Sequence, residues 1–348
     1  MASRRHEINS IEIARMAGVS RSTVSRVVNN YPNVPPETRE KVMRIIEKYN
    51  YFPNVSAQVL AGKKTRTIGL FLVGAGSVAG DIVANMLISS VIENASGCGY
   101  YVLTHILRST NDGDAVRRVK EIFYQRRIDG GIFIGAPNEE PLIESLIAEG
   151  FAVGIVDQHL PGKSDPNRLV VNFDNATGME LAVGYLAELN HRDIGIINGA
   201  MNRFSGPDKY ESFRRAMERR GLPVNPDWVL PGDFHEPAGY EAVNRLLASG
   251  KPLPTAIIAA NDSVAFGAMR ALKEHGLRVP DDMSIIGFDD HVLSAMQQPA
   301  LTTIRVDFQS QMKHLTDGII RYIETGTSFS EPYLAPSELV IRDSCRRL

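Results

Sequence analysis

A short segment near the N-terminus carries the side chains best suited to reading DNA. If residues 20–29 form a helix, its three valines share one face. The opposite face then carries Ser22, Ser25, Arg26 and Asn29, with Arg21 at its N-terminal edge. Arginine matches the acceptor groups of guanine in the major groove, and short hydroxyl side chains contact bases or phosphates. We therefore predict that residues 20–29 are a recognition helix, although any one of these residues alone would suit an ordinary solvated helix.

A second group of polar residues directly follows predicted strands. In open parallel sheets, ligands collect beyond the carboxyl ends of the strands. That rule selects Asp157, Asn261, Asp262, Asp289 and Asp290. Carboxylate and amide groups there can bond several hydroxyls, and Phe234 can stack on the apolar face of a pyranose. We expect a polyol site in which Asp157, Asn261 and Asp289 contact the ligand, whereas Asp262 and Asp290 cap the following helix or loop.

Other motifs that resemble catalytic or cofactor sites do not fit. The glycine-rich segment 74–80 follows a strand, but its last spacing is one residue too long for the dinucleotide fingerprint. The eight histidines are scattered, and none of their spacings suits a metal pair. The sequence has no nucleophile elbow and no phosphate-binding Walker loop. We expect no cofactor, no bound metal and no catalysis.

Two further helices are predicted to position the recognition helix. Residues 10–17 show apolar side chains at helical spacing, Asn9 or Ser10 can cap their start, and Gly18 can end the helix. Ser20 can cap the recognition helix. Residues 36–49 repeat apolar side chains at helical spacing and would close a three-helix core. Two helices joined by a short glycine-containing turn predict a helix-turn-helix head.

Residues 54–62 are predicted to form a hinge helix. The segment is apolar at Val55, Val59 and Leu60 and is followed by Lys63 and Lys64. A helix of about two turns is marginal alone, so it would fold only when paired with a partner copy and DNA. Leu60 would then wedge into a minor-groove step and kink the duplex. A plain linker is the alternative.

The remaining sequence alternates strands with amphipathic helices. Strands are predicted at residues 67–73, 100–106, 130–134, 152–156, 169–171, 194–197, 228–230, 256–260 and 284–288. Such alternation predicts parallel sheets with helices on both faces. Residues 159–168 show no strong helix and divide the series into two halves. We expect two similar lobes around a cleft.

Charge and composition agree with this division. The chain has 348 residues, more than one compact core usually holds. Residues 1–66 contain 12 Lys and Arg against 5 Asp and Glu, a net charge of +7, which leaves -9 on the rest. Only the head has the positive net charge that favours binding to a polyanion such as DNA. Two cysteines without ligand spacing, and no apolar run of about 18 residues, favour a cytoplasmic protein without a membrane span.

In these motifs the sequence resembles the lactose repressor/galactose repressor (LacI/GalR) family of bacterial transcriptional regulators. The resemblance covers nearly the whole chain and rests on residues 13–29 and on Thr38-Arg-Glu-Lys-Val42, Tyr51-Phe-Pro-Asn54, Pro254-Thr-Ala-Ile257, Asn261-Asp262, Gly276-Leu-Arg-Val-Pro-Asp-Asp282, Ile286-Gly-Phe-Asp-Asp290 and Leu301-Thr-Thr-Ile304. Two residues depart from the family pattern. Pro35 stands where a serine usually caps the third helix, and Lys209 stands where an arginine usually binds the sugar.

The resemblance implies a domain plan. An all-α helix-turn-helix head would span residues 1–52, a hinge 53–65, and an α/β effector-binding and dimerisation domain 66–348. That domain would have the two-lobed periplasmic-binding-protein type I fold with doubly wound parallel sheets. We expect an N-lobe at about 66–163 and 293–325 and a C-lobe at about 164–292 and 326–348, with about three crossings.

The resemblance also implies site residues. Effector contacts are expected from Asp157, Lys209, Phe234, Asn261 and Asp289, with Val73, Arg203 and Val306 lining the pocket. The predicted DNA-binding residues are Asn9, Ser20, Arg21, Ser22, Thr23, Ser25, Arg26, Asn29, Asn54, Val55, Ala57, Leu60 and Lys63.

The function predicted from these features is that of a homodimeric transcriptional repressor of carbohydrate-utilisation genes. It would bind a pseudo-palindromic operator in double-stranded DNA under the control of a sugar or phosphosugar. The sequence leaves open which effector is bound and whether that effector releases or promotes DNA binding. A sugar-binding transport receptor is the alternative, since the body alone would have that architecture. An enzyme of the NAD type is a third possibility, which the glycine spacing disfavours.

Overall fold

The computed structural model describes residues 8–52, 59, 62–74, 82–158, 162, 165–327, 334 and 336–348. The chain divides into two compact units, Met1–Thr65 and Arg66–Leu348, which we call the head and the body. The predicted hinge residues Asn54, Val55, Ala57 and Leu60 lie outside the described residues.

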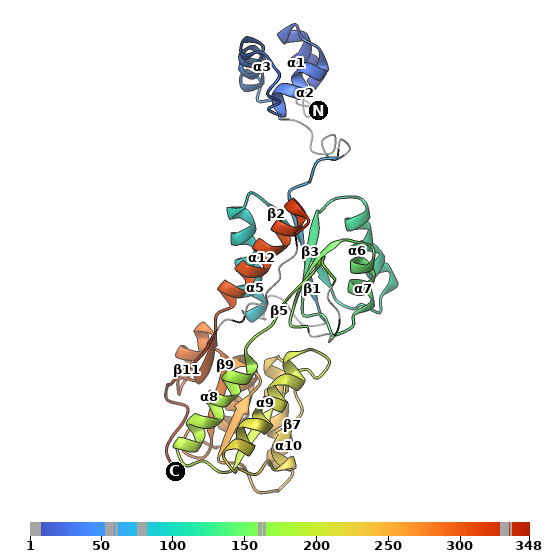
Figure 1. Cartoon of the computed structure of the whole chain (residues 1–348). Coiled ribbons are helices and arrows are strands. Elements are labelled where there is room, and N and C mark those ends of the chain that lie inside the picture. The colour runs from blue at the N-terminus through green and yellow to red at the C-terminus, as the bar shows by residue number, and fades with distance from the viewer. Residues whose placement is uncertain are drawn as a thin grey trace, which may run out of the picture. The chain divides into compact units, whose positions relative to one another are not determined.

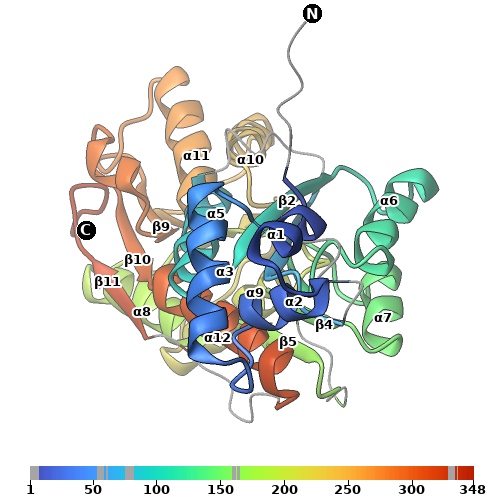
Figure 2. The ribbon, with the colours of Figure 1, turned by 90° about the horizontal axis from the view of Figure 1, so that it is seen from above.

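The head contains three described helices, α1 (Ser10–Ala17), α2 (Arg21–Val28) and α3 (Pro36–Lys48). Asn9 caps α1 through a reciprocal pair of bonds with Glu12, and Gly18 ends it at a left-handed φ of 63°. The helices enclose a small apolar core, and Figure 2 shows them grouped together. As predicted, α3 begins after Pro35 without a side-chain cap.

The first lobe of the body is built on a five-stranded parallel sheet in the order β2-β1-β3-β4-β5. Its strands are β1 (Thr67–Val73), β2 (Tyr101–Leu107), β3 (Gly130–Ile134), β4 (Ala152–Val156) and β5 (Arg168–Val171). Helices α5 (Ile82–Gly97) and α12 (Phe308–Thr325) cover one face of the sheet, and α6 (Gly113–Tyr124) and α7 (Pro141–Ala148) cover the other (Figure 1). Because both faces are covered, β3 and β4 are buried along their whole length.

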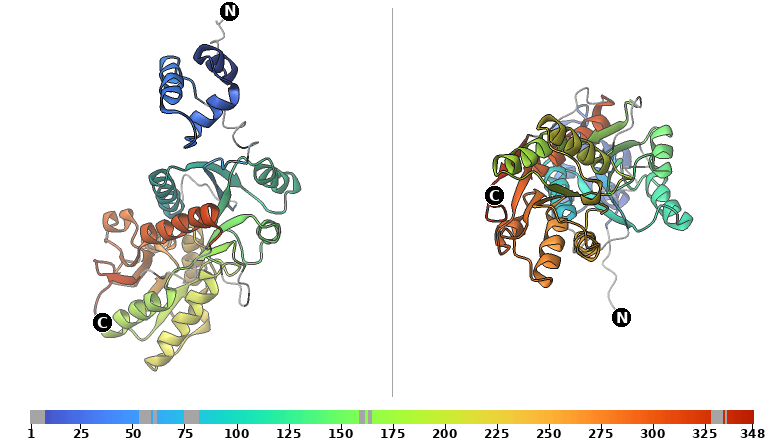
Figure 3. Two further views of the ribbon diagram at one scale, coloured as in Figure 1. Left: turned by 45° about the horizontal axis from the view of Figure 1, so that its top comes forward. Right: turned by 90° about the horizontal axis from the view of Figure 1, so that it is seen from below.

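The second lobe is built on a six-stranded sheet in the order β11-β10-β9-β8-β6-β7. Its strands are β6 (Ile194–Ile197), β7 (Val229–Leu230), β8 (Ala256–Ala259), β9 (Ser284–Asp289), β10 (Thr302–Val306) and β11 (Ser337–Val340). Only β11 runs antiparallel to its neighbour among these described strands. Helices α8 (Asn175–Glu188) and α9 (Ser205–Arg219) lie side by side on one face (Figure 3). Helices α10 (Glu236–Ala248) and α11 (Asp262–Glu274) cover the other face.

The strand ladders correct the predicted lobe boundaries. β5 pairs with β4 of the first sheet, so the first lobe continues to Val171 and does not end near residue 163. β10 pairs with β9 and β11, so residues 302–306 belong to the second sheet and do not return the chain to the first lobe near residue 293. The chain passes between the lobes after β5, after β10 and between α12 and β11.

Two smaller differences concern strands. Trp228 was expected in a strand but lies in the short 3-10 helix η2 (Pro226–Trp228) that precedes β7. Strands β10 and β11 were not predicted at all. Within the described part of the chain, no helix has both the length and the apolar character required to cross a lipid bilayer.

Candidate functional site

The structure places the predicted polar face of α2 in solvent. Val24 and Val27 are buried in the head core, whereas Arg21, Ser22, Ser25 and Arg26 are exposed. The half-buried Thr23 and Asn29 stand at its edge. This arrangement leaves a narrow surface of compact donors and two guanidinium groups on one side of a short helix. Such a face has the size and chemistry of a helix that enters the major groove.

Several predicted DNA-binding residues also hold the head together. Ser20 caps α2 by accepting from the Thr23 amide at 3.1 Å, and its hydroxyl also bonds those of Ser22 and Thr23. Arg21 Nε donates to Ser10 Oγ at 3.1 Å. Asn9 accepts from two amides at the start of α1. Ser20 and Asn9 therefore fix where the two helices begin.

The C-terminal end of the same face lies next to Lys63. Asn29 Nδ2 donates to Ser25 Oγ at 3.2 Å, and Lys63 Nζ donates to Asn29 Oδ1. Lys63 therefore adds a third cationic group, after Arg21 and Arg26, beside the recognition helix within the head.

In the body, Asp157 links the two lobes. It follows β4 in the first lobe at a left-handed φ of 67°. Its Oδ1 accepts from the backbone amide of Ser205 at 2.9 Å and from its hydroxyl at 2.5 Å, at the start of α9 in the second lobe. Burial raises the pKa of Asp157, although these two bonds and the charge of Arg203 oppose that shift.

Lys209 projects from α9 into the interior of the second lobe. Its ammonium donates to the carbonyl of Ala260 at 2.6 Å and lies 3.6 Å from the centroid of the Phe288 ring. Burial lowers the pKa of Lys209, and the charges of Asp289 and Asp157 work against this effect. The structure therefore brings Lys209, Asp157 and Asp289 into one buried electrostatic cluster.

The other predicted effector residues surround this cluster. Asn261 caps α11 by accepting from the Val264 amide, and its Nδ2 donates to the backbone carbonyl of Phe234 at 2.9 Å. Asp289 is buried at a φ of 116°, and Val306 is buried at the end of β10. Each residue thus lies at the carboxyl end of a strand or next to one, as the ligand rule for parallel sheets requires.

A cavity of about 240 Å³ lies between the lobes next to this cluster, because the ring centroid of its lining residue Phe234 lies 5.9 Å from the Lys209 ammonium. The first lobe lines it with Val73, the last residue of β1, and with residues that follow β1, β2 and β3, namely Gly74, Arg108, Ser109, Thr110, Gly135 and Pro137. The second lobe lines it with Ala200, Asn202, Arg203, Asp233, Phe234 and His235. Three predicted residues, Val73, Arg203 and Phe234, line the cavity. The other five, Asp157, Lys209, Asn261, Asp289 and Val306, are not among its lining residues.

Arg108, Ser109 and Thr110 line the cavity but were not predicted as site residues. They directly follow β2, a predicted strand, so their position at a strand end is the signal that could have identified them. They are a cation and two hydroxyls, whereas the predicted strand-end residues were carboxylates and an amide.

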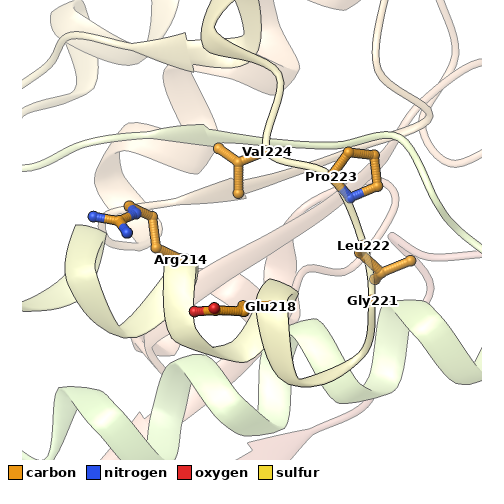
Figure 4. Close-up of a pocket in the computed structure, with 6 residues that line it drawn as sticks. All are labelled: Arg214, Glu218, Gly221, Leu222, Pro223 and Val224. Carbon is orange, nitrogen blue, oxygen red and sulfur yellow. The ribbon is translucent and has the colours of Figure 1, made fainter.

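A second, more open depression does not lie between the lobes. It has a volume of about 440 Å³ and lies at the end of α9, where Arg214 and Glu218 on the helix face Pro223 and Val224 on the following loop (Figure 4). It contains none of the predicted site residues and lies at a single lobe's surface. We assign it no ligand.

Asp262 and Asp290 were expected to cap the helix or loop that follows, but Asn261 caps α11 and both carboxylates bond distant groups instead. Asp262 accepts from Thr303 Oγ1, Ser294 Oγ and the His291 amide at 2.5–2.7 Å. Burial raises the pKa of Asp262 to about 6, against the opposing effect of these bonds. Asp290 forms ion pairs with Arg305 and Arg342. Within the described residues, no three His, Cys, Asp or Glu side chains are grouped to hold a metal ion.

Comparison with protein families separates the same two units. Residues 11–54 match the family described as "Bacterial regulatory proteins, lacI family". Residues 183–345 match the family described as "Periplasmic binding protein-like domain".

Whole-chain relatives combine both parts. The "HTH-type transcriptional repressor PurR" of Haemophilus influenzae (strain PittEE) is 34% identical over 344 residues, which cover 97% of this chain and 98% of that protein. A lac repressor dimer bound to operator and an anti-inducer has 28% identity, a TM-score of 0.83, and coverage of 97% and 99% of the two chains. A CelR–cellobiose complex has 25% identity, a TM-score of 0.74 and the same coverage. This chain therefore belongs to the lacI family of bacterial regulatory proteins.

Proposed function

We propose that the protein is a transcriptional repressor whose head binds operator DNA and whose body controls that binding in response to a small molecule. The observation that carries the proposal is the exposed polar face of α2 in a head whose chain continues into a two-lobed body with a cavity between its lobes. A relative that covers nearly the whole chain is a repressor by name, which supports the same function.

In this proposal α2 enters the major groove. Arg26 and Ser22 project from the middle of its exposed face and contact base edges, with Ser25, Thr23 and Asn29 beside them. Arg21 and Lys63 neutralise phosphates at the two ends of the face. Asn9 and Ser20 present backbone and side-chain groups at helix starts, where phosphates bind well. The hinge residues Asn54, Val55, Ala57 and Leu60 are proposed to contact the minor groove.

The proposed effector occupies the cavity between the lobes. Val73, Arg203 and Phe234 line that cavity, and the cluster of Asp157, Lys209 and Asp289 lies next to it. A polyhydroxylated ligand would bond the polar groups and stack on Phe234, while Asn261 and Val306 hold the pocket's shape. The lac repressor and CelR relatives were solved with small molecules bound, which supports an effector in this body.

The proposed active form is a homodimer on a pseudo-palindromic operator. Two heads would bind half-sites about one helical turn apart. The lac repressor relative is a dimer on operator DNA, which supports this arrangement. A protein that reads the bacterial chromosome works in the cytoplasm, and we assign it no catalytic activity. Under this proposal the effector changes the angle between the lobes and thereby biases DNA binding.

Selection of bound sequences from a random duplex library tests the proposal against a transport receptor. The full chain is expected to enrich one inverted repeat and to retard it in gel-shift assays far more strongly than a scrambled duplex. If no sequence is enriched at low salt while sugars still bind, the receptor alternative is correct.

A further inference from the structure

The wall of the inter-lobe cavity carries an excess of positive charge. Among the described residues, its charged lining residues are Arg108, Arg203 and Asp233, a net formal charge of +1 with His235 neutral. The body as a whole has nine more acidic than basic residues outside the first 66 positions. A positive cavity in an acidic domain attracts anions because low-dielectric walls focus its field.

Asp233, the one carboxylate among the described residues of this wall, already has partners. Asp233 accepts from the His235 amide at 2.6 Å, and its other oxygen lies 3.4 Å from His235 Nδ1. Burial alone would raise the pKa of Asp233, but the His235 contacts and the charge of Arg203 outweigh it and lower that pKa. Asp233 therefore remains ionised and engaged with its own loop.

Arg203 reaches across the cavity from the second lobe to the first. Its guanidinium lies 5.8 Å from the centroid of the Phe234 ring and next to the backbones of Gly74 and Gly135. A side chain at Gly135 would lie 2.5 Å from the Val73 carbonyl and 3.4 Å from Arg203 Nη2. The positive φ of 85° and the nearby Val73 carbonyl require glycine at this position, and the Arg203 guanidinium would be in van der Waals contact with a Cβ there.

The loops that carry the two arginines are held in place by backbone bonds. The Gly74 amide donates to the carbonyl of Leu107, the residue before Arg108, at 3.1 Å. The Asn138 amide of the first lobe donates to the Asn202 carbonyl of the second at 2.9 Å, one residue before Arg203. Arg108 of the first lobe and Arg203 of the second thus line one cavity, and Ser109 and Thr110 follow Arg108 in its lining.

We infer that the effector carries an oxyanion, a phosphate or carboxylate group, which binds between Arg108 and Arg203. This inference rests on the proposed function of the body as an effector-binding domain. Guanidinium groups bind such oxyanions through two parallel hydrogen bonds, and neighbouring hydroxyls add further donors. The rest of the ligand would extend over Phe234 toward the buried cluster of Asp157, Lys209 and Asp289.

The test uses the full chain and three matched probes, D-glucose, D-glucose 6-phosphate and D-glucuronate, with inorganic phosphate as the minimal anion. Binding is measured by calorimetry and by thermal shift at constant ionic strength set with chloride. We expect saturable binding of inorganic phosphate and of at least one anionic sugar, and weaker binding of glucose. A preference for glucose 6-phosphate over glucuronate identifies phosphate, and the reverse identifies carboxylate.

Two arginine variants and a control complete the test. Arg108→Gln and Arg203→Gln, one in each lobe, are each expected to weaken anion binding roughly tenfold or more. Arg117→Gln removes an exposed arginine of α6 that pairs with Glu121, and it should leave anion binding unchanged. Circular dichroism checks that each variant folds.

Three outcomes overturn the inference: no saturable anion binding, stronger binding of neutral glucose than of both anionic sugars, or equal anion binding in both arginine variants and wild type. The proposed repressor function is judged separately, by sequence-selective DNA binding of the wild-type chain. Anion binding without DNA selectivity would refute the repressor proposal and leave the anion site standing.

Discussion

Asp157 at the end of β4 accepts two hydrogen bonds from Ser205 at the start of α9, so a buried carboxylate of one lobe is satisfied by donors of the other. The bond to the Ser205 hydroxyl is short, at 2.5 Å, and lies next to the cavity residue Arg203. Because this contact joins the two lobes, a change in the angle between them can strain it. A ligand in the cavity could therefore act on the Asp157–Ser205 contact and change the relative populations of different lobe orientations.

Ser205→Ala tests how much this link stabilises the body. The substitution removes the hydroxyl that donates to Asp157 and that also accepts from Asn175 Nδ2 at 3.2 Å, and it leaves Asp157 with the Ser205 amide, so the free energy of unfolding should fall by about 1–3 kcal/mol. Urea unfolding of the full chain, followed through the body's signal, measures the change.

The same helix offers a matched control. Ser212 also lies in α9 and is buried, but its hydroxyl has no hydrogen-bond partner in the described structure. Ser212→Ala should leave stability unchanged or raise it. If Ser205→Ala is no more harmful than Ser212→Ala, the inter-lobe link contributes nothing.

Arg26→Ala tests the recognition face of α2. Arg26 is exposed in the middle of that face, so its loss should cost about 1–3 kcal/mol at the base pair that it contacts and relax specificity there. Repeating the sequence selection with the variant measures the change. Arg44→Ala on α3 removes an exposed arginine that pairs with Glu40 and should leave the selected sequence unchanged. An unaltered preference in Arg26→Ala would contradict the assigned face.

Lys63→Ala tests a phosphate contact. It should weaken binding to specific and scrambled duplexes alike, and reduce the dependence of log K on log salt by about 0.9. Gel-shift titrations at several chloride concentrations give the slope. Lys251→Ala, which removes an exposed lysine of the body that pairs with Asp227, is the matched loss of charge. A slope that falls equally in both variants would show that net charge alone is responsible.

Asp262 predicts a pH dependence of stability. Its folded pKa of about 6 exceeds the ordinary value of 3.8, so its stabilising contribution is full below about pH 4 and is lost as pH rises through 6. Relative to Asp262→Asn, the wild type should lose about 3 kcal/mol between pH 4 and 7. Unfolding of both proteins across this range measures the difference, and parallel pH profiles would show that the carboxyl does not titrate in that window.

The sequence predicted those parts of the fold whose signal is local. Strand β1 is a continuous apolar run and was predicted with its observed bounds, as were the head helix α1 and the Ser20 cap of α2. Strands β10 and β11 were not predicted because their residues are largely polar. Thr302 and Thr303 are nevertheless buried, and their side chains bond groups far away in the sequence. Thr303 Oγ1, for example, donates to Asp262, forty-one residues away in the chain. Spacing alone cannot reveal such a partner.

The candidate site was predicted in part for a similar reason. The rule of strand ends identified Asp157, Asn261 and Asp289, and the family resemblance added Lys209 and Arg203. Neither the rule nor the resemblance indicated that Asn261 caps α11 while its Nδ2 donates to the Phe234 carbonyl. Nor did they indicate that the Lys209 ammonium donates to the Ala260 carbonyl. Arg108 lines the same cavity because β2 is the neighbour of β1, which is a property of the strand order.

The central claim is that the cavity and the head are energetically coupled, and reciprocity tests it most directly. An effector that changes operator affinity by some factor must have its own affinity changed by the same factor when operator DNA is bound. Calorimetry should therefore give different affinities for the effector with and without the selected operator duplex, by the factor found in gel shifts and by at least fivefold. Equal effector affinities in the free and DNA-bound protein would contradict the account.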